Sequence, residues 1–119
     1  MKKDNPIAEK SKAFAIRIIR LYQYMLSEKK EHVLSKQVLR SGTSIGANIR
    51  EAISAQSKKV FIAKMQIALK EACETEYWLE LLQDTGYVTE NAGGSLFADC
   101  HELYQMITAI LKTAKVNMD

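Results

Sequence analysis

The stretch SKKVFIAKMQIALKEACETEYWLELLQD, residues 57–84, decides the fold class, because it holds no glycine or proline and repeats apolar residues with a helical period. At about 100° per residue, one wide face of this segment collects Phe61, Ile67, Ala68, Thr75, Trp78, Leu79 and Leu82. Gly86 follows at the place where a left-handed residue closes a helix. The stretch therefore predicts a long amphipathic helix over about residues 57–84.

Three further segments show the same period. The first begins at Pro6, a residue suited to a first helical turn, runs to about Lys29, and shows an apolar arc of Ile7, Phe14, Ile18, Leu21, Tyr22 and Met25. The second, about residues 34–56, carries Leu34, Val38, Ile45, Ile49, Ala52 and Ile53 on one face. The last segment begins either after a Thr89 cap, with a kink at Gly93-Gly94, or after a Ser95 cap. One of its faces collects Leu96, Cys100, Leu103, Tyr104, Ile107, Ile110, Leu111 and Ala114.

Four long helices with short connections predict an all-α fold, an antiparallel up-and-down four-helix bundle. A chain of 119 residues has room for one domain, residues 1–119. Gly42 and Gly46 weaken the second helix, since each costs about 1 kcal/mol relative to alanine. The apolar period continues in phase across both, which favours a close helix–helix approach over a local break at residues 41–43.

Composition sets further limits. The chain is 47% hydrophobic and 26% charged, which is typical of a globular protein. No apolar run approaches the ~18 residues of a membrane span, and no signal-peptide core follows the N-terminus. We therefore expect a cytoplasmic protein with no membrane association. Cys73 and Cys100 are too few for a disulfide framework or a structural zinc site.

The charge is divided along the chain. Residues 1–60 hold 13 Lys and Arg against 5 Asp and Glu, whereas residues 61–119 hold 4 against 9. The basic half could bind a polyanion such as nucleic acid. The two halves could also meet between neighbouring subunits of a head-to-tail oligomer. An uneven solvated surface is the third interpretation, and the charge split leaves all three open.

A stripe of mostly short polar residues lies opposite the apolar face of the second helix. It comprises Gln37, Arg40, Ser41, Ser44, Asn48 and Glu51. Short uncharged side chains permit another surface to approach closely. That surface is the adjacent helix of the same bundle, a neighbouring subunit or a nucleic-acid backbone, in this order of preference.

Two carboxylates interrupt the apolar face of the third helix. Glu71 projects into the middle of that face and Glu74 lies near its edge. An unpaired buried carboxylate costs several kcal/mol, so a cation is expected opposite. Lys64 and Arg40 are the candidates, and we predict that Arg40 pairs with Glu71 or Glu74. Replacing Arg40 by alanine is then expected to cost several kcal/mol.

Catalytic motifs are missing from the sequence. A di-iron bundle needs inward Glu-x-x-His motifs on two helices, and neither His32 nor His101 lies in one. Neither cysteine has a histidine nearby in sequence to activate it. No glycine-rich phosphate loop or triad spacing occurs. We therefore predict a protein that is not an enzyme, with no metal and no cofactor.

Two long motifs carry a family resemblance. Residues 37–52, QVLRSGTSIGANIREA, and residues 61–79, FIAKMQIALKEACETEYWL, closely resemble bacterial four-helix-bundle proteins encoded within intervening sequences of 23S ribosomal RNA genes, often labelled ribosomal proteins. The resemblance implies an up-and-down bundle, a ring-shaped homopentamer and no assigned catalytic residue. It also links the chain to an accessory protein of diversity-generating retroelements that binds nucleic acid. The motif positions that it carries over are Arg40, Ser41, Ser44, Asn48, Glu51, Lys70, Glu71, Glu74 and Trp78.

The sequence thus favours a homo-oligomeric accessory protein associated with RNA or DNA, a pentamer if it follows the resembled family. The candidate phosphate contacts are Lys12, Arg17, Arg20, Arg50, Lys58 and Lys59. The alternative is a scaffold that binds a protein partner and has no affinity for nucleic acid. Lys64, Lys70, Glu71 and Glu74 are the candidate buried charge partners.

Overall fold

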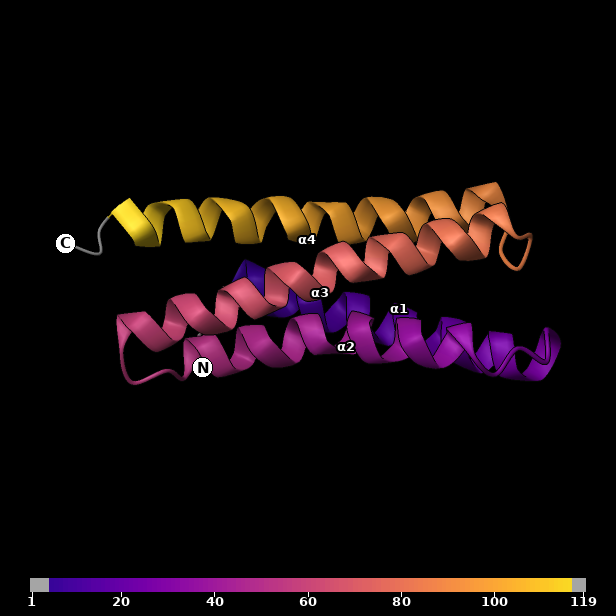
Figure 1. Ribbon diagram of the computed structural model, residues 1–119, viewed down its shortest axis with the longest axis horizontal. Helices are drawn as coiled ribbons and strands as arrows, with labels where there is room; N and C mark the ends of the chain where they lie inside the picture. Colours follow the sequence, from indigo (N-terminus) through magenta and orange to yellow (C-terminus); the bar gives the residue numbers. More distant parts are fainter. Residues whose placement is uncertain (1–4, 117–119) are drawn as a thin grey trace.

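The computed structural model describes residues 5–116, which form four helices. These are α1 (Pro6–Glu28), α2 (Leu34–Ile53), α3 (Lys58–Asp84) and α4 (Glu90–Val116). Successive helices run in opposite directions in a bundle that measures 50 × 24 × 23 Å (Figure 1). Within residues 5–116 there is no β-strand. The predicted all-α, antiparallel four-helix bundle is confirmed.

The helix boundaries follow from their caps. The Asn5 side chain accepts a hydrogen bond from the backbone N–H of Ala8 (3.3 Å), directly before Pro6. Ser57 caps α3 by accepting from the N–H of Val60 (3.1 Å), for which it takes an extended conformation at φ −142° and ψ 157°. The chain must leave the preceding helix to reach this conformation. The sequence-based extension of the second helix to residue 56 is therefore wrong, and α2 ends at Ile53.

The connection between α3 and α4 was predicted from two residues. Gly86 has φ +82°, and the N–H groups of Gly86 and Tyr87 donate to the carbonyls of Gln83 (3.1 Å) and Leu82 (2.9 Å). This left-handed closure of α3 is the one that the glycine predicts. Thr89 Oγ1 accepts from the N–H of Ala92 (3.1 Å), so the earlier of the two expected starts of α4 is confirmed. The helix continues through residues 93 and 94.

A carboxylate caps α2, and the sequence analysis did not find it. The side chain of Glu31 accepts hydrogen bonds from the N–H groups of Val33 (3.1 Å), Leu34 (2.9 Å) and Ser35 (2.8 Å). The Ser35 hydroxyl donates back to the Glu31 carbonyl oxygen (2.9 Å). Partial desolvation raises the pKa of Glu31, but the three N–H donors together outweigh it and lower the pKa. The free N–H groups and the positive end of the helix dipole are thus satisfied by one side chain.

We predict that Glu31→Gln destabilises the fold by about 1 kcal/mol at pH 7, as for the loss of other helix caps. Because the folded-state pKa of Glu31 lies below its unfolded value of about 4.3, the stabilisation is complete above that value. It is lost as the pH falls through the folded pKa. Urea unfolding should therefore show the full difference from wild type at pH 7 and a smaller one as the pH is lowered toward about 3. Glu28→Gln, at the C-terminal end of α1, is the control and should show no loss, so an equal loss in both variants would contradict the assignment.

The buried positions follow one another at spacings of mostly three or four residues along each helix, the pattern of a left-handed bundle seam. On α2 they are Ser35, Val38, Ser41, Gly42, Ile45, Ile49 and Ala52, and on α3 they are Ile62, Met65, Ala68, Ala72, Thr75, Leu79 and Leu82. This period of 3.5 residues differs from the 3.6 of a straight helix. Over the length of α3 the difference is large enough to displace a face projected at 100° per residue.

The apolar face expected for the third helix is therefore partly wrong. Ile67 is 39% exposed, whereas Met65 is 1% exposed and Ala72 is fully buried. Phe61 and Trp78 are only partly buried and pack at the margin of the core. The apolar residues of α3 form a buried seam and a second, outer strip, and the projection combined the two.

The two glycines of α2 mark a close approach to α1, as predicted. A Cβ atom at Gly42 would lie 2.8 Å from Cγ1 and 2.9 Å from Cγ2 of Ile18. A Cβ at Gly46 would lie 3.4 Å from the carbonyl oxygen of Ser11. The helices thus meet nearly backbone to backbone. None of the helices in the described part of the chain combines the length and hydrophobicity needed to cross a bilayer.

Candidate functional surfaces

An ion-pair cluster joins α2 and α3 at the middle of the bundle. Arg40 Nη1 lies 3.2 Å from Glu71 Oε1, and Arg40 Nη2 contacts Glu74 Oε2. The indole N–H of Trp78 donates to the same Glu74 oxygen (3.0 Å). This donation is the largest influence on the pKa of Glu74 and lowers it; desolvation opposes it, while Arg40 and Lys70 reinforce it. The predicted pairing of Arg40 with these carboxylates is confirmed.

The cluster lies at the margin of the core, which corrects its expected burial. The Glu71 side chain is 14% exposed, but that of Arg40 is 48% exposed. Lys70, a candidate buried partner, is exposed. Lys64 pairs with Glu51 of α2 (2.8 Å) at the surface. Residue 71 lies beside the buried seam of α3 and not within it. The Glu71 carboxylate therefore lies at the margin of the core and stays in contact with water.

We predict that Arg40→Ala costs about 1–2 kcal/mol, between a surface ion pair and a buried charged hydrogen bond. This is less than the several kcal/mol expected from the sequence, because half of the Arg40 side chain remains hydrated. Arg40→Lys should recover part of the loss, since it keeps the charge but not the forked geometry. Urea unfolding at pH 7 measures both. Arg20→Ala is the control, because among the described residues the Arg20 guanidinium bonds only to Gln23. This variant should cost less than half as much as Arg40→Ala, and equal losses would contradict the prediction.

Several residues of the polar stripe of α2 form hydrogen bonds within the subunit. Ser41 is fully buried, and its hydroxyl lies 2.9 Å from Thr75 Oγ1 on α3. Ser44 donates to the Arg40 carbonyl oxygen (2.6 Å) and Asn48 to that of Ser44 (2.8 Å). Ser41 thus contacts α3, whereas Ser44 and Asn48 bond to carbonyl groups of α2 itself. At the ends of the stripe, Gln37 and Glu51 are exposed.

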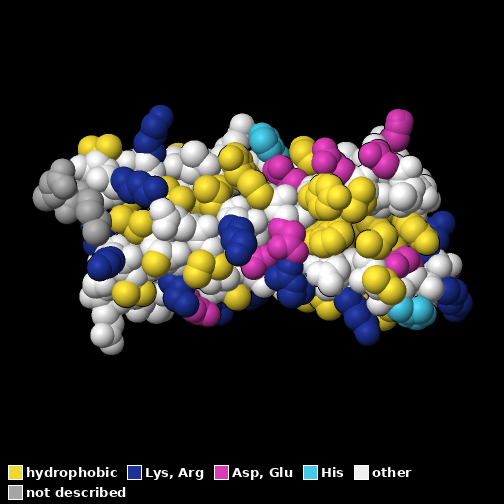
Figure 2. All heavy atoms as spheres, in the orientation of Figure 1, with side chains coloured by type: hydrophobic (Ala, Val, Ile, Leu, Met, Phe, Trp, Pro, Cys, Tyr) yellow, Lys and Arg dark blue, Asp and Glu magenta, His cyan; other side chains and the backbone are white. Residues whose placement is uncertain are grey.

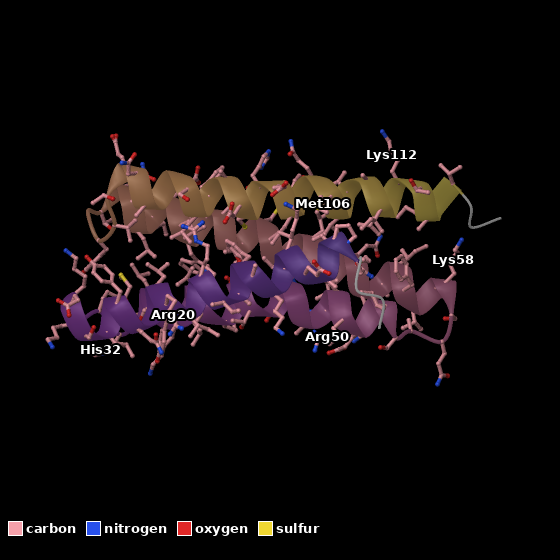
Figure 3. The ribbon with its side chains drawn as sticks, turned by 180° about the vertical axis from the view of Figure 1, so that it is seen from behind. Arg20, His32, Arg50, Lys58, Met106 and Lys112 are labelled. Atoms are coloured by element: carbon pink, nitrogen blue, oxygen red, sulfur yellow. The ribbon has the colours of Figure 1, made fainter. Side chains whose placement is uncertain are left out.

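The candidate phosphate contacts fall into two groups. Arg17 bonds Asp99 on α4 (2.6 Å), so its charge is already matched. The others are exposed: Lys12, Arg20, Arg50, Lys58 and Lys59. Figure 3 shows Arg20 on α1 and Arg50 on α2, in the layer of the bundle away from α4.

Much of the charge asymmetry is matched within one subunit. Lys10 lies 3.2 Å from Glu102, so two ion pairs, this one and Arg17–Asp99, cross from α1 to α4. Arg40 joins α2 to the acidic residues of α3. A meeting of basic and acidic halves thus occurs inside the monomer, and the charge split does not require a second subunit.

His101 and Cys100 are neighbours on α4, whereas Cys73 is exposed on α3 and His32 is exposed between α1 and α2. His101 stacks between Phe97 and Tyr104, at ring-centroid distances of 6.1 and 5.7 Å, and its Nδ1 lies 2.9 Å from Glu76 Oε2. Cys100 is fully buried, and burial raises the pKa of its thiol, which makes it a poor nucleophile. No group of three His, Cys, Asp or Glu residues that could hold a metal occurs in residues 5–116.

The outer strip of α3 leaves large apolar side chains in water. Val60 is 44% exposed, Ile67 39% and Tyr77 54%. The strip continues on to the partly buried Phe61 and Trp78. Figure 2 shows hydrophobic side chains gathered across this face of the molecule, on both sides of a central charged group. Exposed apolar side chains on both sides of a charged cluster are a candidate interaction site.

The fold and these surfaces define a small all-α bundle protein with no recognisable catalytic constellation among its described residues. The model of the family described as 23S rRNA-intervening sequence protein matches residues 3–109. The chain belongs to this family. It is also similar to the crystal structure, at 1.70 Å resolution, of a protein of unknown function from the S23 ribosomal protein family of Bacteroides thetaiotaomicron VPI-5482. That similarity has 55% identity and a TM-score of 0.88, over 89% of this chain and 98% of the other. The comparison with curated proteins gives no match.

Proposed function

We propose that the protein is a non-enzymatic, cytoplasmic homo-oligomer that associates with RNA or DNA. The observation that carries the oligomer is the outer apolar strip of α3, which one subunit leaves uncovered. Hydrophobic burial of Val60, Ile67 and Tyr77 against another copy would remove these side chains from water. The resemblance of the two sequence motifs adds the number of subunits, five in a ring.

Light scattering coupled to size exclusion tests the oligomer. The expected mass is five times the 13.5 kDa of one subunit. Ile67→Glu should lower that mass while the helical circular dichroism is kept, because it places a charge inside the interface. Ile16→Glu makes the same change at a residue of α1 that is 48% exposed and should leave the mass unchanged. A wild-type protein that is monomeric at micromolar concentration would contradict the proposal.

Nucleic-acid association is supported by the exposed cations of α1 and α2. Arg20 contacts no carboxylate of residues 5–116, and the acidic residues of the chain lie mainly on α3 and α4. Phosphate contacts release counterions, so binding should weaken steeply as salt rises. Fluorescence anisotropy with RNA and DNA probes at increasing salt measures this. Binding that is absent at low salt, or that does not change with salt, would rule it out.

A protein scaffold is the second candidate, and a groove between α1 and α4 favours it. The groove has a volume of about 430 Å³ and an apolar floor that includes Leu21, Val88 and Leu96, with Tyr24 exposed beside it. It is suited to an amphipathic helix of a partner. Pull-downs with and without nuclease separate the two functions: capture that survives nuclease and is lost on Tyr24→Glu, at a lining residue that is 42% exposed, supports the scaffold.

A further inference from the structure

The seam between α1 and α2 differs from the other seams of the bundle in its charge. Ion pairs cross from α1 to α4 and from α2 to α3, and a contact of 2.9 Å between His101 Nδ1 and Glu76 Oε2 joins α4 to α3. Among the described residues none crosses from α1 to α2, because both helices belong to the basic half of the chain. Cations on this seam therefore have no carboxylate across it to match them.

A groove of about 350 Å³ follows this seam, and two of those cations line it. Lys12 projects from α1 and Arg50 from the last turn of α2. Neither forms an ion pair with any described residue, and Glu9, one turn before Lys12, does not pair with it. No carboxylate from the described part of the chain lines the groove. Among the described residues, no carboxylate in the groove therefore balances the charge of these two cations.

The floor of the groove is shaped by the close approach of the two helices. Gly46 has no side chain, and its backbone lies against the carbonyl of Ser11. The remaining lining side chains are small: Ala8, Ala15, Ala47 and Thr43. A ligand can thus reach the helix backbones between two long cationic side chains, whose stems line the groove and whose charged ends extend into water.

We propose that this groove binds the sugar–phosphate backbone of single-stranded nucleic acid, with Lys12 and Arg50 each on one phosphate. The inference rests on the nucleic-acid association proposed above and assigns it a site. The groove has a volume of only about 350 Å³ between two packed helices, and we therefore assign it one strand and not a duplex. A positively charged groove that follows the backbone is one of the features by which proteins bind single strands without sequence preference. Aromatic stacking is the other, and the described residues that line this groove include no aromatic one, so the contact assigned here is to the backbone alone.

The test compares two double variants that remove equal charge. Lys12→Gln/Arg50→Gln alters the groove, and Lys112→Gln/Lys115→Gln removes two exposed cations of α4; Figure 3 shows Lys112 at the edge of the bundle away from Arg50. Both variants are first checked for helicity, thermal unfolding and oligomeric mass. The probe is a fluorescein-labelled single strand of about 20 nucleotides, titrated at salt concentrations from about 50 to about 300 mM. A duplex of about 20 base pairs and a poly-glutamate peptide are titrated in parallel.

The groove variant should lose at least about tenfold in affinity at the lowest salt. Its plot of log K against log salt should also become less steep, by at least about 1.4, which corresponds to two phosphate contacts. The α4 variant should change neither by more than about twofold. Equal losses in both variants would overturn the groove while leaving nucleic-acid association standing. No binding of wild type to any nucleic acid would overturn both. Stronger binding of the duplex or of poly-glutamate would also overturn the assignment, the latter in favour of an acidic protein segment.

Discussion

Replacing Ile18 by alanine is expected to lower the free energy of unfolding by about 2–5 kcal/mol, the cost of a large-to-small change in a closed core. Ile18 is fully buried and lies at the point where α1 meets α2. Its Cγ atoms occupy the space that a side chain at Gly42 would take. Neither helix can move inward to fill the void, because their backbones already approach closely.

Urea unfolding monitored by circular dichroism at 222 nm (about the helical minimum) measures the loss. Ile16→Ala makes the same chemical change two residues earlier on α1, where the side chain is 48% exposed. It should cost less than about 1 kcal/mol, since most of the transfer free energy is never gained there. Similar losses in the two variants would mean that α1 is rotated about its axis relative to the structure.

Replacing Gly42 by alanine should destabilise the bundle by about 1–3 kcal/mol, although alanine is the better helix former by about 1 kcal/mol. The new methyl group would lie 2.8 and 2.9 Å from the two Cγ atoms of Ile18. Ile18 is β-branched and fully enclosed, so both atoms must move together or the helices must separate. Overpacking therefore outweighs the gain in helix propensity.

Gly94→Ala is the matched control, because a Cβ atom at that position would meet no atom of the described residues within 4 Å. There the same substitution should stabilise α4 by about 0.5–1 kcal/mol. The two variants should thus shift the urea midpoint in opposite directions. In the background of Ile18→Ala, where the clashing atoms are gone, Gly42→Ala should lose most of its cost. A stabilising Gly42→Ala in the wild-type background would contradict the close approach of the helices.

The helices and most of their ends could be read from local sequence. Pro6, Ser57, Gly86 and Thr89 each act within three or four residues of themselves, so their effect does not depend on the rest of the fold. The close approach of α1 and α2 was predicted from an apolar period that continues through both glycines of α2. Glu31 was missed, although its signal is local: an acidic residue three positions before the first residue of α2.

The candidate surfaces were harder to predict. The pairing of Arg40 with Glu71 and Glu74 followed from the cost of an unmatched carboxylate. Its exposure did not, because that depends on the rotation of α3 about its own axis. The same rotation explains why Ile67 lies outside the core. Likewise, the sequence counts the basic residues of α1 as equivalent cations, and only the positions of the acidic side chains show which of them are matched.

The sequence by itself determined that this chain forms four amphipathic helices with these caps, and its two motifs indicated its family, because both are written in residues close together along the chain. The tertiary structure decided which strip of each helix is buried and which charges are matched. Those depend on a 3.5-residue bundle seam and on contacts between residues up to 92 positions apart, such as Lys10 and Glu102. The outer strip of α3 and the cationic groove between α1 and α2 exist only once the helices are packed.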